Sequence, residues 1–240
     1  MNAIQKIRNK TLFLKQVRLK NITSKEPVYI FHHIHKCGGT SIENALRNWF
    51  FLIREYNLPG PPKNLETYRN FMCLSGHFGT ENTFLFEKYP FIFDDQRYQL
   101  FTIVRDPLDR AISRYFHGRK LGYKEFLDWR IEDYLAIINN WMASVLQCTE
   151  DNYEEILGRY FFVGILEELQ ASLNILAHFM DRKPMQIPHV NKTKRDDKLS
   201  TISKATLDDF KQRNQLDYKI YEWAKEKFYS THLPLIEPDT

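Results

Sequence analysis

The chain contains 240 residues, of which 43% are hydrophobic and 15% aromatic, and only nine are glycine. This composition excludes a disordered or collagen-like chain, and the length allows one large domain or two small ones, with a core that needs no disulfides. The formal net charge is +4, but seven of the 34 Lys and Arg lie in residues 1–25, which contain no Asp or Glu. The remaining residues carry 27 basic and 30 acidic side chains, a balance that does not support nucleic-acid binding.

The first residues of the chain form a basic segment, and we therefore divide the chain into an N-terminal extension at 1–25 and a single domain at 26–240. The extension mixes basic with apolar residues, so it could lie on an anionic membrane surface or remain a solvated, loosely docked tail. No apolar run reaches the roughly 18 residues that span a bilayer, and no secretory signal is present. Three widely spaced cysteines fit a reducing compartment. We expect a cytoplasmic protein, in which residues 1–25 either contact the inner face of the membrane or remain a solvated tail.

Strands and helices alternate along the rest of the chain. Short apolar runs predict strands at Val28–Ile34, Phe71–Leu74, Tyr98–Val104 and Tyr160–Val163. Apolar spacing predicts helices at Ser41–Glu55, from Pro107 to about Lys120, and at 123–130, 132–148, 151–159, 167–180, 203–213 and 215–229. This order predicts an α/β fold, with a central parallel sheet flanked by helices and a helix-rich C-terminal half.

Polar sequence follows each of the first three predicted strands. The three segments read HIHKCGGTS at 33–41, SGHFGT at 75–80 and VRDPLDRAISRY at 104–115. Four of the nine glycines (Gly38, Gly39, Gly76 and Gly79) fall in the first two segments, where we expect sharp turns or close backbone approach. Because ligands bind beyond the carboxyl ends of parallel strands, all three segments are candidate parts of one site.

The first segment has the features of a phosphate-binding loop. A glycine loop between a strand and a helix presents backbone N–H groups and the positive end of the helix dipole to an anion. Lys36 adds a mobile charge, and Thr40 and Ser41 add hydroxyl donors. The lysine precedes the glycines, so this is not the Walker pattern. The alternative is a tight turn with a helix N-cap, which would explain neither Lys36 nor the paired hydroxyls.

The second segment places Arg105 at the end of a strand and Ser113 in the following helix. The planar guanidinium group of arginine suits phosphate recognition because it donates two parallel hydrogen bonds. The alternative is an exposed ion-pair network on the helix, formed by the neighbouring charged residues Asp106, Asp109, Arg110 and Arg114.

Together, HIHKCGGTSIENAL and FTIVRDPLDRAISRYF resemble the paired signature of sulfotransferases that use 3′-phosphoadenosine 5′-phosphosulfate (PAPS). The nearest match is the carbohydrate group that includes heparan sulfate 2-O-sulfotransferase. FVGILEELQASLNIL and PHVNKT resemble later parts of the family pattern more weakly, so the resemblance covers residues 27–195. It implies a P-loop-like sheet and transfer of a sulfuryl group from PAPS to an acceptor hydroxyl, on a carbohydrate or another molecule, with no metal.

The resemblance also implies roles for individual residues. Those implied to bind the 5′-phosphosulfate are Lys36, Gly38, Gly39, Thr40 and Ser41, and those implied to bind the 3′-phosphate are Arg105 and Ser113. Cys37 belongs to the same cofactor-binding segment, where we interpret it as a small packing residue and not a nucleophile. His35 stands where the family usually has proline, a departure that removes no phosphate ligand.

The third segment contains His77, which corresponds to a histidine that the family places in a Gly-His motif after the second strand. Transfer to a hydroxyl needs a base that takes its proton, and an imidazole is a natural candidate. The alternative for His77 is a cap on the strand end. We therefore expect His77 and Lys36 to be catalytic, with His117 and His189 as candidates for the acceptor side.

Two other groups of residues have structural interpretations. His32, His33 and His35 lack a carboxylate or cysteine at a spacing that would complete a metal site. The aromatic residues of 115–129 favour helix core over a sugar-stacking surface. Two further function classes remain open: an ATP-dependent P-loop kinase, and a catalytically silent nucleotide- or glycan-binding module. The identity of the acceptor cannot be inferred from these motifs.

Overall fold

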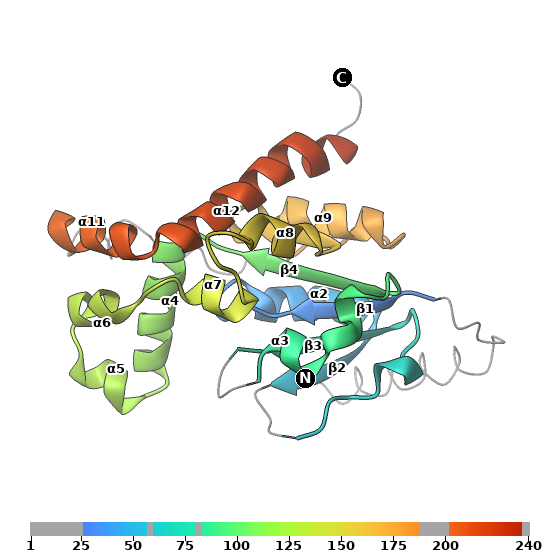
Figure 1. The fold of residues 1–240 in the computed structure, drawn as a ribbon, viewed down its shortest axis with the longest axis horizontal. Coiled ribbons are helices and arrows are strands. Elements are labelled where there is room, and N and C mark those ends of the chain that lie inside the picture. The colour runs from blue at the N-terminus through green and yellow to red at the C-terminus, as the bar shows by residue number, and fades with distance from the viewer. Residues whose placement is uncertain (1–25, 57–59, 80–82, 188–201, 237–240) are drawn as a thin grey trace.

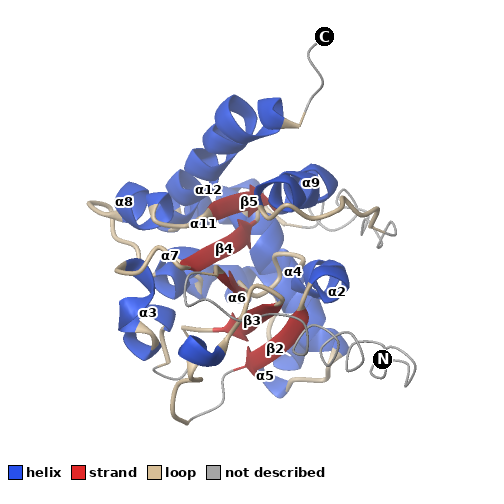
Figure 2. Ribbon diagram, turned by 90° about the vertical axis from the view of Figure 1, so that its right-hand side faces the viewer, coloured by secondary structure: helices blue, strands red, loops and turns tan. Residues whose placement is uncertain are grey.

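The computed structural model describes residues 26–56, 60–79, 83–187 and 202–236. Its centre is a five-stranded sheet with the order β2-β3-β1-β4-β5, in which every pair of neighbours is parallel (Figure 2). The strands are β1 Val28–His32, β2 Phe51–Tyr56, β3 Met72–His77, β4 Tyr98–Val104 and β5 Phe162–Ile165. The predicted parallel sheet flanked by helices is therefore confirmed.

Helices cover both faces of this sheet. Figure 2 shows α2 and α9 on one side and α3, α7 and α8 on the other. The helices are α2 Gly39–Trp49, α3 Leu85–Lys88, α4 Pro107–Lys120, α5 Lys124–Asp128, α6 Ile131–Ile137, α7 Trp141–Leu146, α8 Tyr153–Gly158, α9 Leu169–Phe179, α11 Lys204–Arg213 and α12 Gln215–Lys227. Most of them lie in the second half of the chain, as predicted.

The position of β1 inside the sheet follows from its sequence. All five of its residues are buried, which is typical of a strand covered on both faces. It pairs with β3 on one side and with β4 on the other. Because all strands run the same way, their carboxyl ends meet at one edge, the edge from which α4 leaves in Figure 1.

The helix α4 begins where the sequence predicts. Pro107 lies in its first turn, where the missing N–H costs nothing, and the Asp106 carboxylate accepts a hydrogen bond of 2.9 Å from the backbone N–H of Asp109. Further along, α4 packs with α5, α6 and α11 around a second apolar cluster that is separate from the core around the sheet (Figure 1).

The helix predicted at Ser41–Glu55 is wrong in its second half. The helix α2 ends at Trp49, because Phe50 adopts an extended conformation with φ −134° and ψ 154°. Phe51–Tyr56 then forms β2, an edge strand that pairs with β3 along its whole length. The partly exposed residues of this edge strand have no clear alternation, and its first residues continue the apolar spacing of α2.

Other predicted helix and strand boundaries also differ from the observed ones. The helix predicted at 132–148 is two helices, α6 and α7, separated at Asn140, whose φ of +41° ends the regular helical path. The strand β3 continues beyond the predicted Leu74 to His77, and β5 lies two residues later than predicted. The short helix α3 was not predicted.

Several predictions concern residues outside the described ranges. These are the basic extension at 1–25, the PHVNKT segment and His189. The division into an extension and one domain, the cytoplasmic location and the membrane contact therefore stay predictions. In the parts of the chain that the structure describes, no helix has the length and apolar character required to cross a bilayer.

A buried carboxylate joins α12 to α7. Asp217 is 1% exposed, and its two oxygens accept hydrogen bonds from the backbone N–H groups of Met142 (3.0 Å) and Ala143 (2.7 Å) at the start of α7. The negative charge also complements the positive end of the α7 dipole.

We predict that Asp217→Ala lowers the free energy of unfolding by about 2–5 kcal/mol, because two buried N–H groups lose their acceptor. Urea unfolding followed by circular dichroism measures the loss. Asp209→Ala is the control, since Asp209 pairs with Arg213 on the surface of α11 and should leave the stability unchanged. Equal effects of the two substitutions would contradict the prediction.

Candidate functional site

The loop after β1 leads directly into the N-terminus of α2. Lys36 (φ +69°) and Gly38 (φ +77°) both have left-handed backbone conformations, and Gly38 caps α2 without any side-chain hydrogen bond. The backbone N–H groups of Ser41 and Ile42 both bond to the Gly38 carbonyl, at 3.0 and 3.2 Å. The positive end of the α2 dipole is thus uncapped by a side chain, as an anion site requires.

Gly39, the first residue of α2, is required by close packing. A Cβ atom at this position would lie 1.4 Å from Nε2 of His33. The His33 imidazole therefore lies directly against the start of α2, and only glycine leaves room for it. Of the hydroxyl residues that follow, Ser41 is half-buried and Thr40 is exposed.

The structure brings the first and second polar segments together. Nη1 of Arg105, the residue after β4, donates a hydrogen bond of 3.2 Å to the backbone carbonyl of Lys36. Burial, followed by the positive charges of Arg105 and Arg114, lowers the pKa of Lys36. Ser113 lies half-buried in the second turn of α4. The positive side chains of Lys36, Arg105 and Arg114 therefore give the loop a positive electrostatic potential, which favours an anionic ligand.

The exposed ion-pair network proposed as an alternative for α4 is wrong at two positions. Arg110 is 1% exposed, and its guanidinium carbon lies 4.2 Å from the centroid of the Trp141 ring. Asp106 caps the helix instead of pairing along its surface. Arg110 thus contributes to the core between α4 and α7, where a cation–π contact replaces exposed ion pairs.

His77, the last residue of β3, lies within a group of aromatic and imidazole rings. Its ring centroid is 3.6 Å from that of His35, 4.1 Å from His33 and 4.6 Å from Tyr56. Its Nε2 atom is buried and has no hydrogen-bond partner among the described residues. The structure therefore brings together histidines from the ends of two neighbouring strands.

Of the two expectations for Gly76, a sharp turn is wrong, because both Gly76 and His77 belong to β3, whereas close backbone approach is confirmed. Gly76 is instead required by packing: a Cβ atom there would lie 2.5 Å from the Phe78 ring and 2.6 Å from the Glu55 carbonyl oxygen. The positive φ of +89° lies later, at Gly79.

Burial keeps the imidazoles of this group neutral. It lowers the pKa of His77 to about 3, helped by the nearby His33 and His32. Burial likewise lowers the pKa of His33 and of His35 to about 3, with further contributions from neighbouring histidines and basic side chains. A neutral imidazole can accept a proton, but the lowered pKa also makes each of these imidazoles a weaker base than a free imidazole.

Cys37 behaves as a packing residue, as predicted. Its side chain is buried in the main core, and burial raises the pKa of the thiol to about 12, so a thiolate nucleophile is disfavoured. On α4, burial and then the positive charges of Lys36, Arg114 and Lys120 lower the pKa of His117.

The aromatic residues of 115–129 divide into two groups. Tyr115 and Phe126 lie in the second apolar cluster, and the Tyr115 hydroxyl donates to the Trp129 carbonyl at 2.7 Å. Their interpretation as helix core is confirmed. Tyr123 and Trp129, in contrast, are 43% and 37% exposed.

Glu43 was not identified from the sequence, although it is 2% exposed and lies within hydrogen-bond distance of residues from three elements. It occupies the buried face of α2 beside Ile42 and Leu46. A charged residue among the apolar positions of an amphipathic helix was the available signal.

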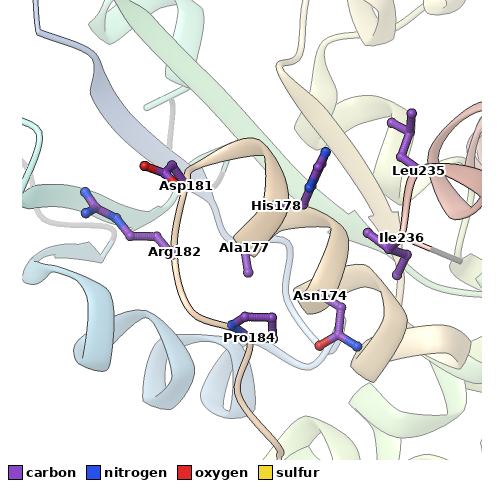
Figure 3. A pocket seen from close by; sticks show the side chains of 8 residues that line it. All are labelled: Asn174, Ala177, His178, Asp181, Arg182, Pro184, Leu235 and Ile236. Carbon is purple, nitrogen blue, oxygen red and sulfur yellow. The ribbon is translucent and has the colours of Figure 1, made fainter. Parts of the chain in front are cut away.

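A pocket of about 470 Å³ is distinct from this site (Figure 3). It lies near the amino ends of the strands, whereas the candidate site lies at their carboxyl ends. The pocket is lined by α9, by the turn that follows α9 and by Leu235 and Ile236. Arg182 of this pocket donates to the carbonyl of Asn70, just before the start of β3, which places the pocket near the amino ends of the strands. Within the described ranges, no three His, Cys, Asp or Glu side chains are arranged to hold a metal ion.

The buried histidines predict acid sensitivity. Burial lowers the pKa of His32 to about 3, and His33, His35 and His77 are shifted in the same way, whereas an unfolded histidine titrates near 6.5. Between about pH 6.5 and pH 3 the unfolded chain binds more protons, so stability falls as the pH falls.

We expect the free energy of unfolding to decrease between pH 7 and pH 5, with His32 alone contributing up to about 1.4 kcal/mol per pH unit below pH 6.5. Urea unfolding at several pH values measures this slope. His32→Phe removes one titrating group and should make the slope shallower. A free energy of unfolding that stays constant over this range would contradict the prediction.

Residues 20–224 match the sequence model of the sulfotransferase family. No curated protein sequence matches the chain. A crystal structure of a sulfotransferase from Alicyclobacillus acidocaldarius is similar over 83% of this chain and 96% of that chain, with 11% sequence identity and a TM-score of 0.48. Because the family match extends over most of the chain, the protein belongs to the sulfotransferase family.

Proposed function

We propose that the protein transfers a sulfuryl group from PAPS to a hydroxyl group of a carbohydrate. Membership of the sulfotransferase family supports sulfuryl transfer. The PAPS donor is a finer proposal that rests on the HIHKCGGTS and VRDPLDRAISRY motifs, whereas the carbohydrate acceptor and the heparan sulfate 2-O-like subgroup rest only on the resemblance to that group. The observation that supports the donor proposal is the hydrogen bond between Arg105 and the Lys36 carbonyl, which joins the two motifs at the carboxyl ends of the strands.

In this proposal the donor lies across both motifs. The 5′-phosphosulfate binds the backbone N–H groups at the start of α2, with Lys36 and the hydroxyls of Thr40 and Ser41 around it. The 3′-phosphate binds Arg105 and Ser113, which would also distinguish PAPS from ATP. Charge-assisted hydrogen bonds to phosphate are among the stronger ones in proteins, so these contacts would dominate the affinity.

The proposed reaction is an in-line displacement at sulfur. The acceptor oxygen forms a bond to sulfur while the bond between sulfur and the bridging phosphate oxygen breaks. The acceptor proton moves to the His77 imidazole, and 3′-phosphoadenosine 5′-phosphate leaves with the bonding electron pair. Lys36 and the amides of α2 stabilise the negative charge that develops on the leaving phosphate.

The activity is tested by incubating the protein with ³⁵S-labelled PAPS and a panel of unsulfated polysaccharides, phenols and alkyl alcohols. Wild-type protein should label a polysaccharide. Lys36→Ala should lower kcat by about 10²–10³-fold and His77→Ala by about 10²–10⁴-fold. Lys225→Ala on α12 and His178→Ala beside the remote pocket are matched controls and should keep full activity.

Each outcome of the activity test separates the function classes. Tight binding of PAPS without transfer to any acceptor would favour a silent binding module. Tight binding of ATP that PAPS cannot displace would favour a kinase. Labelling of a phenol or alcohol instead of a polysaccharide would retain the sulfotransferase but replace the carbohydrate acceptor.

The role of Arg105 predicts a specific loss of affinity. Arg105→Ala should weaken binding of 3′-phosphoadenosine 5′-phosphate by about 1.5–3 kcal/mol, the range for hydrogen bonds to charged groups, as measured by calorimetry. Affinity for adenosine 5′-phosphosulfate, which lacks the 3′-phosphate, should change little. Arg159→Ala is the control, since Arg159 pairs with Glu155 on the surface of α8. An unchanged affinity in Arg105→Ala would exclude Arg105 as the 3′-phosphate ligand.

A further inference from the structure

Glu43 is a buried carboxylate with an unusually complete set of partners. Its Oε1 accepts a hydrogen bond of 2.7 Å from Ser75 Oγ and a further one from the hydroxyl of Tyr56. Its Oε2 accepts bonds from Arg54, at 2.9 Å from Nε, and from Arg47, at 3.3 Å. These donors offset the cost of burying the charge and hold the carboxylate in one orientation.

Three neighbours of Glu43 are also neighbours of His77. Ser75 lies two residues before His77 on β3. Tyr56 is the register partner of His77 on β2, and its ring centroid lies 4.6 Å from that of His77. His33 lies with its Nδ1 3.9 Å from Glu43 Oε1 and its ring centroid 4.1 Å from that of His77. One carboxylate therefore accepts hydrogen bonds from Ser75 and Tyr56 and adjoins His33, and the rings of Tyr56 and His33 lie beside the His77 imidazole.

Glu43 also belongs to the helix that begins at the phosphosulfate loop. It lies four residues after Gly39, so it shares the rigid backbone of α2 with that glycine. The His33 ring fills the space where a Cβ atom of Gly39 would lie. The start of α2, His33 and Glu43 are thus packed together, and any displacement of α2 would be transmitted to the surroundings of His77.

A second buried glutamate, Glu55, has a hydrogen-bond network of its own that does not include His77. Glu55 is 4% exposed, forms an ion pair with Lys88 and accepts a hydrogen bond of 2.5 Å from the Tyr89 hydroxyl. Like Glu43, it combines a buried carboxylate with a cation and a tyrosine. Glu55 lies between Arg54 and Tyr56 on β2 and is the register partner of Gly76, but its side-chain partners lie at α3 and the residue that follows and differ from those of Glu43, so it offers a matched comparison.

We propose that Glu43 is a positioning residue that fixes the His77 imidazole relative to the phosphosulfate loop, through Ser75, Tyr56 and His33. The inference rests on the proposed role of His77 as the base. Glu43 acts through His77 and does not itself contact the donor or the acceptor. A displacement of about 1 Å at a reacting group can lower a rate by about 100-fold, so a loosened His77 should reduce turnover without weakening donor binding.

The test compares Glu43→Gln with Glu55→Gln, using the acceptor from the panel that takes up ³⁵S label. Glu43→Gln should lower kcat by about 10–100-fold and leave the dissociation constant of 3′-phosphoadenosine 5′-phosphate within about two-fold of wild type. Glu55→Gln should keep the wild-type kcat even if it lowers stability. Circular dichroism and urea unfolding confirm that each variant is folded under the assay conditions.

A double variant separates positioning from a general structural effect. Because Glu43 acts through His77, Glu43→Gln should cause little further loss of kcat in a His77→Ala background. Nuclear magnetic resonance of the imidazole groups provides a readout without an acceptor: the His77 signal should shift in Glu43→Gln and stay in place in Glu55→Gln.

The outcomes are distinct. A wild-type kcat in folded Glu43→Gln, a full multiplicative loss in the double variant, an unmoved His77 signal, or an equal loss of kcat in Glu55→Gln would overturn the role of Glu43 and leave the proposed function intact. Absence of label transfer by the wild-type protein would instead overturn the proposed function.

Discussion

The parallel pairing of β1 with β3 and β4 is the constraint on which the rest of the structure depends. Three polar segments that are far apart in the sequence follow these strands, and only a parallel arrangement brings them to one edge. The register adds precision: His32 pairs with Gly76, so the end of β1 lies beside His77. The strand β4 continues beyond its pairing with Phe31, and this extension lets Arg105 reach the Lys36 carbonyl.

Close packing at the carboxyl ends of the strands requires unusual backbone conformations and small residues. Lys36 adopts a left-handed conformation that is uncommon for residues with a side chain, and such strain is typically found at functional sites. Gly39 allows the His33 imidazole to lie against α2, and Gly76 allows β3 to approach Phe78 and Glu55. Small residues thus let α2, β3 and the histidines lie closer together than ordinary side chains would permit.

The sequence predicts the parts of the fold that have strong local signals. The β4 strand and the α4 helix have the predicted bounds, because a mostly apolar run is followed, after Arg105 and Asp106, by a proline that favours a helix start. The edge strand β2 was read as a continuation of α2, because its partly exposed residues lack a clear alternation and its pairing with β3 is a tertiary contact. Local spacing cannot reveal such a contact.

In the candidate site, too, some residues can be predicted from local sequence, whereas others depend on tertiary contacts. The Lys36 loop and Arg105 each follow a strand, His77 ends one, and all three carry distinctive residue types, so the sequence indicates them directly. The grouping of His33, His35 and His77, the burial of Arg110 and the network around Glu43 depend on distances between elements, which no motif contains. Glu43 had only one local signal, its place on the apolar face of α2.

The central claim is that one anionic donor spans the Lys36 loop and Arg105. A crystal structure with 3′-phosphoadenosine 5′-phosphate bound tests it most directly. Our account predicts the 5′-phosphate at about 2.7–3.2 Å from the backbone nitrogens at the start of α2, and the 3′-phosphate on the Arg105 guanidinium group and the Ser113 hydroxyl. A nucleotide bound in the pocket beside α9, or one with its 3′-phosphate away from Arg105, would contradict the account.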